Sequence, residues 1–382
     1  MKKIEILAPA GSFDSVIAAV RSGADAVYLG EKAFSARSSA KNFDDEELKK
    51  ATAYCHIHGV KVYVTINTIV FDDELEKLKK AIISAAEADV DALIVQNMGV
   101  ARLAHRLVPD LALHASTQMS IHTASGVKAL YEMGFKRVVL AREMSKKEIE
   151  KCCEIPVELE VFVHGAMCVS FSGRCLLSSY LVNRDANRGE CAQPCRWGYH
   201  LMEEKRDGQY FPVFEDDKGT YILNSKDLCM INHIDKLAEA GVTSLKIEGR
   251  AKSAYYVAVI TNAYRMAVDW HKKHFGEPLP DWISEEVFKV SHRKYCTGFF
   301  FGHPKDCQFY ENGGYIRNYD VVAVIENCCG GFIYATQRNR FFLGDTLEIF
   351  SPGCKPVIVK PEKIFNEEHE EITSVNHAMM KF

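Results

Sequence analysis

Hydrophobic positions along the first 250 residues follow two spacings in turn. Short runs rich in β-branched residues alternate with longer stretches in which apolar residues recur at helical spacing, as in DSVIAAVRSGA and DELEKLKKAIISAAEADV. The first kind of run predicts a buried strand, and the second predicts an amphipathic helix. Eight strands are expected in this way, at residues 4–10, 26–30, 61–67, 92–97, 112–117, 137–143, 157–165 and 244–250.

This alternation predicts an α/β fold. Strands joined by helices pair in parallel through right-handed crossovers, and eight such units in about 250 residues are typical of a (β/α)8 TIM-type barrel. Three joins repeat one shape, a helix end followed by a turn and a strand, in SGADAVYLG, ADVDALIVQN and AGVTSLKIEG. A doubly wound open sheet is the alternative, but no G-x-G-x-x-G motif follows the first strand.

The rhythm is interrupted once. Between the seventh strand, which ends near Gly165, and its helix, expected at about 228–240 with a cap at Asn224 or Ser225, the chain inserts some 60 residues. We therefore predict a barrel domain at 1–275 that carries a Cys-rich insertion at 165–227, with one or two β-hairpins in residues 196–227. An insertion after a strand lies at the carboxyl-terminal face, where TIM barrels carry their active sites.

The pattern changes after the last barrel helix, expected at 253–274. A Pro-rich break opens a connector at 276–314, and short alternating runs separated by Gly and Pro then follow. These runs predict a small C-terminal antiparallel β-barrel domain at 315–382.

Composition limits the function classes. A net charge of −4 argues against a basic coat for nucleic acid, although a local patch can still bind phosphate. No apolar run approaches 18 residues, and the segment MKKIEILAPAGS reads as a strand rather than a signal peptide. We therefore expect a cytoplasmic protein with no membrane partner, in which thiols stay reduced.

Four of the thirteen cysteines gather in 28 residues of the insertion: Cys168, Cys175, Cys191 and Cys195. In a reducing compartment such a cluster indicates a metal site or catalysis rather than disulfides. The spacing is C-x6-C, fifteen residues, then C-x3-C, and only the last pair has the C-x2–4-C spacing of zinc sites. Wider, irregular spacing suits a [4Fe–4S] cluster, in which each iron takes one thiolate. A zinc clip is the alternative, and Cys229 is a possible substitute ligand.

Polar residues at the predicted strand ends are the other candidates. Those proposed as catalytic are His164, His114, Glu248 and Arg250. Those proposed to bind substrate are Asn67, Gln118 and the insertion arginines Arg174, Arg184, Arg188 and Arg196, which would suit a phosphate or the carboxylates of a small anionic co-substrate. For each residue alone, a cap or a satisfied loop group is an equally good interpretation. No HExxH or G-x-S-x-G motif is present, so a hydrolase is poorly supported.

Several longer segments carry a family resemblance. They are ELEVFVHGAMCVSFSGRCLLSS, NRGECAQPCRW, LAPAGSFDSVIAAVRSGADAVYLG and YCTGFFFG. With them the chain resembles peptidase family U32, the collagenase-like peptidases, over nearly its whole length. Better-understood members resemble oxygen-independent hydroxylation proteins with a [4Fe–4S] cluster, acting on tRNA wobble uridine, ribosomal RNA or ubiquinone precursors.

The resemblance implies a role for the cysteines and a substrate. By motif, Cys168, Cys175, Cys191 and Cys195 take the ligand positions, and relatives with a downstream fourth ligand keep Cys229 open. In its length and its C-terminal module, the chain is most similar to the tRNA 5-hydroxyuridine branch of the family. Prephenate is the oxygen source that this similarity implies. The alternatives are a U32-type peptidase and a non-catalytic cluster protein that binds RNA or a partner enzyme. The resemblance also leaves open whether the protein works with a second subunit of the same family.

Overall fold

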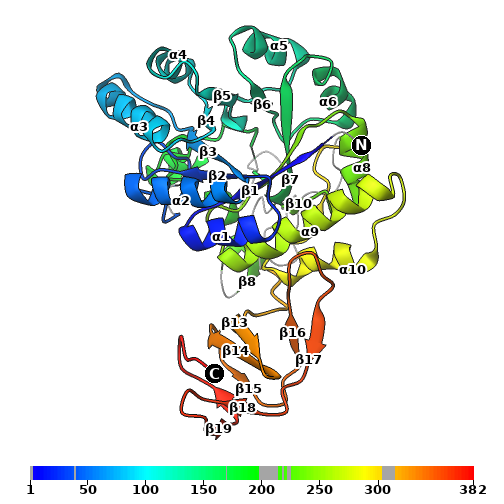
Figure 1. The fold of residues 1–382 in the computed structure, drawn as a ribbon. Helices are drawn as coiled ribbons and strands as arrows, with labels where there is room; N and C mark the ends of the chain where they lie inside the picture. The colour runs from blue at the N-terminus through cyan, green and yellow to red at the C-terminus, as the bar shows by residue number, and fades with distance from the viewer. Residues whose placement is uncertain are drawn as a thin grey trace.

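The computed structural model of the chain describes residues 3–37, 40–168, 170–197, 214–216, 219–221, 225–302 and 315–382. Its centre is a closed barrel of eight parallel strands (Figure 1), since each strand pairs with the next and β11 pairs with both β7 and β1. The predicted (β/α)8 fold is therefore confirmed. The barrel strands are β1 (Glu5–Pro9), β2 (Ala26–Gly30), β3 (Lys61–Ile66), β4 (Ala92–Val95), β5 (Ala112–Ala115), β6 (Arg137–Val139), β7 (Glu158–Ala166) and β11 (Ser244–Ile247).

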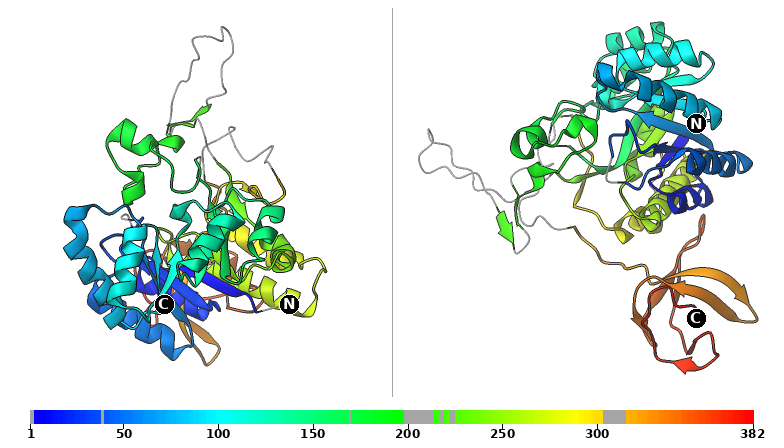
Figure 2. Two further views of the ribbon diagram at one scale, coloured as in Figure 1. Left: turned by 90° about the horizontal axis from the view of Figure 1, so that it is seen from above. Right: turned by 90° about the vertical axis from the view of Figure 1, so that its left-hand side faces the viewer.

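Helices surround the barrel, as the two further views in Figure 2 show. They are α1 (Phe13–Arg21), α2 (Asp45–Ile57), α3 (Leu75–Glu87), α4 (Met98–Leu107), α5 (Ala124–Glu132), α6 (Lys146–Cys152), α8 (Ile234–Glu239) and α9 (Ala254–Lys273). Local signals fix their starts: Asp44 and Glu47 form a capping box at α2, and the Ser253 hydroxyl accepts a bond from the backbone of α9. Of the described residues, none belongs to a helix long and apolar enough to cross a bilayer.

Alternate residues of each barrel strand face opposite sides of the wall. In β3, Val62 and Val64 pack outward beneath the helices, whereas Tyr63 belongs to a separate cluster inside the barrel. That inner apolar cluster is small and consists of Leu7, Ala26, Tyr28, Tyr63, Ala92 and Ile94. Charged side chains occupy much of the remaining axis, which differs from the branched apolar layers that usually fill such barrels.

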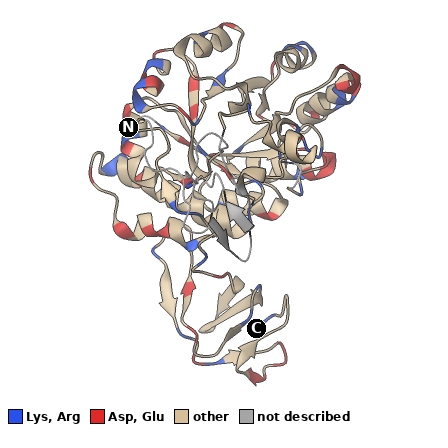
Figure 3. Ribbon diagram, turned by 180° about the vertical axis from the view of Figure 1, so that it is seen from behind, with Lys and Arg blue, Asp and Glu red and all other residues tan. Residues whose placement is uncertain are grey.

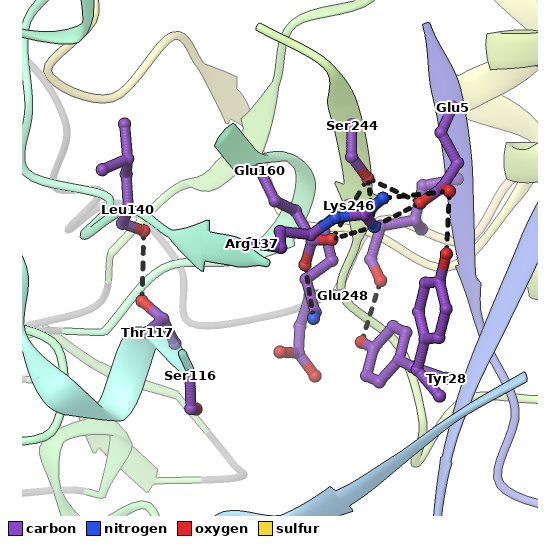
Figure 4. A network of polar contacts seen from close by, with 12 residues as sticks. Glu5, Tyr28, Ser116, Thr117, Arg137, Leu140, Glu160, Ser244, Lys246 and Glu248 are labelled. Carbon is purple, nitrogen blue, oxygen red and sulfur yellow. Dashed lines mark hydrogen bonds and ion pairs between the residues drawn. The ribbon is translucent and has the colours of Figure 1, made fainter. Parts of the chain in front are cut away.

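The charged part of the axis is centred on Glu160 of β7 (Figure 4). This fully buried carboxylate accepts hydrogen bonds from Arg137 at 3.0 Å and Lys246 at 2.7 Å. Burial alone would raise the pKa of Glu160, but Lys246 and Arg137 together lower it to about 2. Arg137 also binds the carboxylates of Glu5 and Glu158, so the buried charges compensate one another.

The insertion contains the short helix α7 (Leu177–Val182) and an antiparallel hairpin of β8 (Phe214–Asp216) and β9 (Gly219–Tyr221). The hairpin confirms the expectation for this segment.

The chain returns from the insertion as a strand that the sequence did not predict. β10 (Asp227–Cys229) pairs antiparallel with the end of β7, and β12 (Tyr295–Cys296), within the predicted connector, pairs in parallel with β10. The helix expected at 228–240 is therefore wrong in its first half, since α8 begins at Ile234. A long-range contact favours the strand over the helix here. The Asp227 carboxylate accepts a hydrogen bond at 3.0 Å from the backbone N–H of Arg293 and one at 2.6 Å from its guanidinium.

The predicted helix caps do not apply. Ser225 precedes β10, and Asn224 lies outside the described residues.

The C-terminal segment is antiparallel, as predicted. After α10 (Asp281–Ser284), four two-stranded ladders surround a small core of Phe341, Ile364 and Val375. The paired strands are β13 (Ala323–Cys329) with β14 (Phe332–Gln337), β15 (Phe341–Phe342) with β20 (Ser374–Val375), β16 (Leu347–Ile349) with β17 (Val357–Val359), and β18 (Ile364–Phe365) with β19 (Glu371–Ile372). The exact domain boundaries stay a prediction.

Contacts with α9 and its neighbourhood hold this segment beside the barrel (Figure 1). The backbone N–H of Gly353 donates to the Asn262 side chain on α9 at 2.7 Å, and Lys289 pairs with Glu348.

Removing Arg137 should destabilise the barrel strongly. Arg137→Met would leave the Glu160 carboxylate buried beside Lys246 without its second cation, and breaking a buried ion pair costs about 3–5 kcal/mol. We expect a loss of that size in the free energy of unfolding measured in urea. The exposed control Arg102→Met should change it by less than about 0.5 kcal/mol. Equal effects of the two substitutions would show that the network contributes no stability.

Glu31, directly after β2, should make stability depend on pH. Its carboxyl is 7% exposed, and burial raises its pKa to about 7. A folded-state pKa above the unfolded value favours folding at low pH, and this advantage is lost as the pH rises through 7. Glu31→Gln should therefore have little effect at pH 4.5 and stabilise the fold by up to roughly 3 kcal/mol at pH 8. Urea unfolding at the two pH values checks this, and a pH-independent difference would contradict it.

Candidate active site

The insertion (green in Figure 2) is seated on loops at the carboxyl-terminal end of the barrel. Two glycines with positive φ make the contact close: a Cβ at Gly173 would lie 2.3 Å from the carbonyl oxygen of Gln118, and one at Gly189 would lie 2.6 Å from that of Ser35. These contacts reach the loops that follow β5 and β2. Arg188 adds bonds to Glu74 at 2.7 and 3.0 Å, beside the start of α3. The insertion therefore covers the barrel mouth, where TIM-barrel chemistry takes place.

The four insertion cysteines differ in their exposure to solvent. Cys168 and Cys191 are exposed, whereas Cys175 and Cys195 are half-buried. Cys168 and Cys191 both contribute, after Glu248, to raising the pKa of Arg37. Two cysteines that are far apart along the insertion thus lie near one guanidinium.

Cysteine sulfur is the donor that both an iron–sulfur cluster and a structural zinc ion take, so the chemistry of the four side chains fits either group. Their arrangement does not complete such a site, because no group of three or more His, Cys, Asp or Glu side chains within the described ranges could hold a metal ion. The ligand roles of Cys168, Cys175, Cys191 and Cys195 therefore stay a prediction.

Glu248, just beyond β11, organises the floor of the mouth. Its carboxylate is 3.2 Å from the guanidinium of Arg37 and 3.2 Å from that of Arg142. Burial would raise the pKa of Glu248, but the surrounding cations lower it, so the group is ionised. Arg142 also lies over the ring of Phe162, at 3.5 Å from its centroid. The sequence placed Glu248 correctly at the mouth.

Arg250 lies in the same floor with partners that carry no charge. It is 4% exposed, and its guanidinium donates to the hydroxyls of Thr65, at 3.0 Å, and Ser35. Burial lowers its pKa to about 10, which leaves it protonated at neutral pH. Arg37 and Arg142 thus share one carboxylate, Glu248, while Arg250 is a third cation bound to hydroxyls, and this balance favours an anionic ligand at the mouth.

His164 is enclosed rather than open to the mouth. Its two ring nitrogens are each 3.3 Å from a tyrosine hydroxyl, of Tyr264 and Tyr295. The Tyr295 hydroxyl donates to the backbone carbonyl of Val287, so it can accept a bond from the imidazole N–H. Burial lowers the pKa of His164 to about 3, so the ring is neutral. Its predicted proton-transfer role stays a prediction, and its surroundings favour a packing role.

His114 does not lie at the mouth, and that placement was wrong. Strand pairing sets it level with Arg137, the first residue of β6, so it lies on the amino-terminal side of the barrel. Its ring packs edge-on against Tyr63 with centroids 4.7 Å apart.

The predicted substrate-binding residues divide into four groups. Asn67 accepts a bond at 3.1 Å from the backbone of Ala36 and so fixes a mouth loop, while Gln118 supports Gly173 through its backbone. Arg188 is bound to Glu74. Arg174 and Arg184 are exposed on the insertion. The side chain of Arg196 lies outside the described part of the chain.

Cys229 lies apart from the insertion, at the end of β10. Burial raises the pKa of its thiol to about 11, which disfavours the thiolate that a metal requires. Its use as a substitute ligand stays a prediction, and its surroundings favour a packed, protonated thiol.

Sequence reasoning missed Arg37, Tyr264, Tyr295 and the Asp227–Arg293 pair. Arg37 stands in an irregular loop with no periodic signal. Tyr264 matches the apolar face of α9 and therefore reads as ordinary core.

Weakening one glycine contact should release the insertion without unfolding the barrel. Gly189→Ala introduces a Cβ that clashes with the loop after β2, whereas the control Gly276→Ala has the same positive φ but open space around it. We expect trypsin to cleave Gly189→Ala faster after Arg184, and we expect both variants to lose a similar, small free energy of unfolding, about 1 kcal/mol. Limited proteolysis with mass spectrometry checks this. Equal cleavage rates would contradict the seating described above.

Comparison with known proteins identifies the family to which the chain belongs. Residues 11–309 match the model of peptidase family U32, and residues 317–382 match that of the peptidase family U32 C-terminal domain. The chain is 35% identical over 388 residues to tRNA hydroxylation protein P1 of Bacillus subtilis, with 99% of this chain and 90% of that protein covered.

Two further relatives carry other names. A collagenase of Porphyromonas gingivalis is 34% identical over 379 residues, covering 94% of this chain and 89% of its own length. A 23S rRNA 5-hydroxycytidine synthase of Escherichia coli is 40% identical over 268 residues, covering 70% and 39%. The resemblance seen in the motifs is confirmed across both parts of the chain: this protein belongs to peptidase family U32.

Proposed function

We propose that this protein is an RNA-modifying enzyme that hydroxylates the wobble uridine of tRNA at carbon 5 without using molecular oxygen. The observation that carries the proposal is a thiol-rich insertion seated over a cationic barrel mouth. Relatives named for tRNA hydroxylation and for 5-hydroxycytidine synthesis in ribosomal RNA support the reaction class.

The surface of the insertion suits an unpaired RNA base. Phe171 and Tyr180 are 58% and 80% exposed, and Arg174 and Arg184, which follow them closely along the chain, are exposed as well. Exposed rings and guanidinium groups stack on splayed-out bases, which is how proteins read single-stranded RNA loops. On the side of the molecule seen in Figure 3, acidic and basic residues are interspersed over the outer helices, so the insertion is the better candidate for RNA contact.

The floor of the mouth suits a small anionic co-substrate. Arg37 and Arg142 share Glu248, while Arg250 is held by hydroxyls alone, so carboxylates of an incoming molecule would find unbalanced positive charge. Prephenate, implied by the family resemblance, has this chemistry. In this proposal the arginines orient the anion and Glu248 holds two of them in place.

A [4Fe–4S] cluster is the cofactor that we propose for Cys168, Cys175, Cys191 and Cys195. Such a cluster, when bound, supplies one-electron chemistry. Zinc is the alternative occupant, and the paired subunit stays a prediction.

Cysteine substitution tests the cofactor and the reaction together. Protein purified without oxygen should carry about four irons and about four acid-labile sulfides per chain, and Cys168→Ser should lose most of both. In a deletion strain, wild type should restore 5-hydroxyuridine in tRNA, measured by nucleoside mass spectrometry, and Cys168→Ser should fall short by at least about tenfold. The control Cys354→Ser changes an exposed thiol of the C-terminal segment and should behave as wild type. Colourless, zinc-loaded protein would contradict the cofactor, and full restoration by Cys168→Ser would contradict its role.

Peptidase activity is the second candidate, favoured by the family description and by the relative named collagenase. The polar side-chain contacts of His164 are to two tyrosines, and these do not form a nucleophile–base pair of the usual kind. An oligopeptide assay on the same preparations decides between the two: cleavage retained in Cys168→Ser, without any change in tRNA, would favour the peptidase.

A further inference from the structure

A cavity of about 530 Å³ opens at the amino-terminal end of the barrel, opposite the insertion. Its wall comes from the starts of β3, β5, β6 and β7, and Lys61, His114, Tyr131, Lys136 and Val157 line it. A volume of this size lies in the range that holds small metabolites. TIM-barrel active sites lie at the other end, so a ligand here would be bound rather than transformed.

The acidic groups of this cavity are already engaged. The Asp91 carboxylate accepts a bond at 2.7 Å from the backbone of Val62 and one at 3.0 Å from His56. The Glu158 carboxylate accepts bonds at 2.6 and 2.9 Å from the guanidinium of Arg137. Arg137 is itself saturated by carboxylates (Figure 4), so it offers nothing to a ligand.

Two cations of the lining differ from these acids, because in the described part of the chain they are not bound to another group. Lys61 and Lys136 are exposed, and across the described ranges neither ammonium group forms an ion pair or a hydrogen bond. They stand at the starts of β3 and β6, on different parts of the wall. The two ammonium groups are therefore the cations of this lining that can still bind the anionic group of a ligand.

The floor of the cavity adds an unsatisfied polar group. His114 is 4% exposed, and its Nδ1 has no hydrogen-bond partner among the described residues. A buried nitrogen in this state loses the bond it would make to water, unless a ligand or an ordered water restores it. Tyr131 and Val157 also line the cavity and supply apolar surface.

We propose that this cavity is a second ligand site, which takes a small organic anion with its phosphate or carboxylate group at Lys61 and Lys136 and its apolar body against Tyr131 and Val157. This inference does not depend on the proposed hydroxylation. The site is also linked to the mouth: Arg137 at the floor and Lys246 share Glu160, and Lys246 lies two residues before Glu248 on the same stretch of chain.

Calorimetric titration of the full chain tests the site with two probes, phenyl phosphate and benzoate. We expect saturable binding of at least one probe to wild type, and the preferred probe identifies the anionic group as phosphate or carboxylate. The Lys61→Glu/Lys136→Glu variant should bind at least about tenfold more weakly, since two attractive charges become repulsive. The control Lys49→Glu/Lys80→Glu reverses two exposed lysines elsewhere and makes the same change in net charge, and it should bind as wild type.

Three outcomes would overturn the proposal. They are the absence of saturable binding of either probe to wild type, equal affinity in Lys61→Glu/Lys136→Glu and wild type, and equal weakening in the control. If the variant weakens binding of a single-stranded oligoribonucleotide while neither small probe binds, the two lysines contact an RNA backbone instead. Thermal unfolding of each variant confirms that the exposed substitutions leave the fold intact, and tRNA hydroxylation is measured separately, since the second site does not depend on that reaction.

Discussion

Glu160 is buried at the centre of the barrel, where Arg137 from β6 and Lys246 from β11 compensate its charge. Taking a carboxylate out of water is strongly unfavourable, so this position is stable only while both cations are in place. The partners come from strands on both sides of β7, and Glu5 of β1 joins through Arg137. The charges therefore link the strands at which the barrel closes. A slip of one residue in β7 would turn Glu160 into the apolar layer under the helices, so the network also specifies register.

The same two strands connect the network to the mouth. β7 carries Glu160 in the axis and His164 near its end, and β11 carries Lys246 followed by Glu248. The short stretch from Lys246 to Glu248 therefore joins the buried ion pairs to the mouth, whereas His164 is neutral and packs against Tyr264 of α9.

Periodicity predicted all eight barrel strands because each is short, apolar and flanked by helical spacing. The periodicity did not predict β10, where Asp227 pairs with Arg293, a residue 66 positions later. No local sequence pattern indicates a contact between residues so far apart. His114 was misplaced because a strand's end can be recognised in a sequence, whereas the height of each residue in the barrel depends on its register with neighbouring strands. Arg37 reaches Glu248 from an irregular loop, and such a contact exists only after folding.

The insertion leaves the barrel at Ala166 and returns at Asp227, and these two residues are paired with each other across β7 and β10. This pairing fixes the base of the insertion, and the contacts of Gly173, Gly189 and Arg188 with the barrel loops fix its position over the mouth. A loop whose two ends are held side by side closes at an entropic cost that grows only slowly with its length. The insertion can therefore gain or lose residues while the strands of the barrel keep their positions.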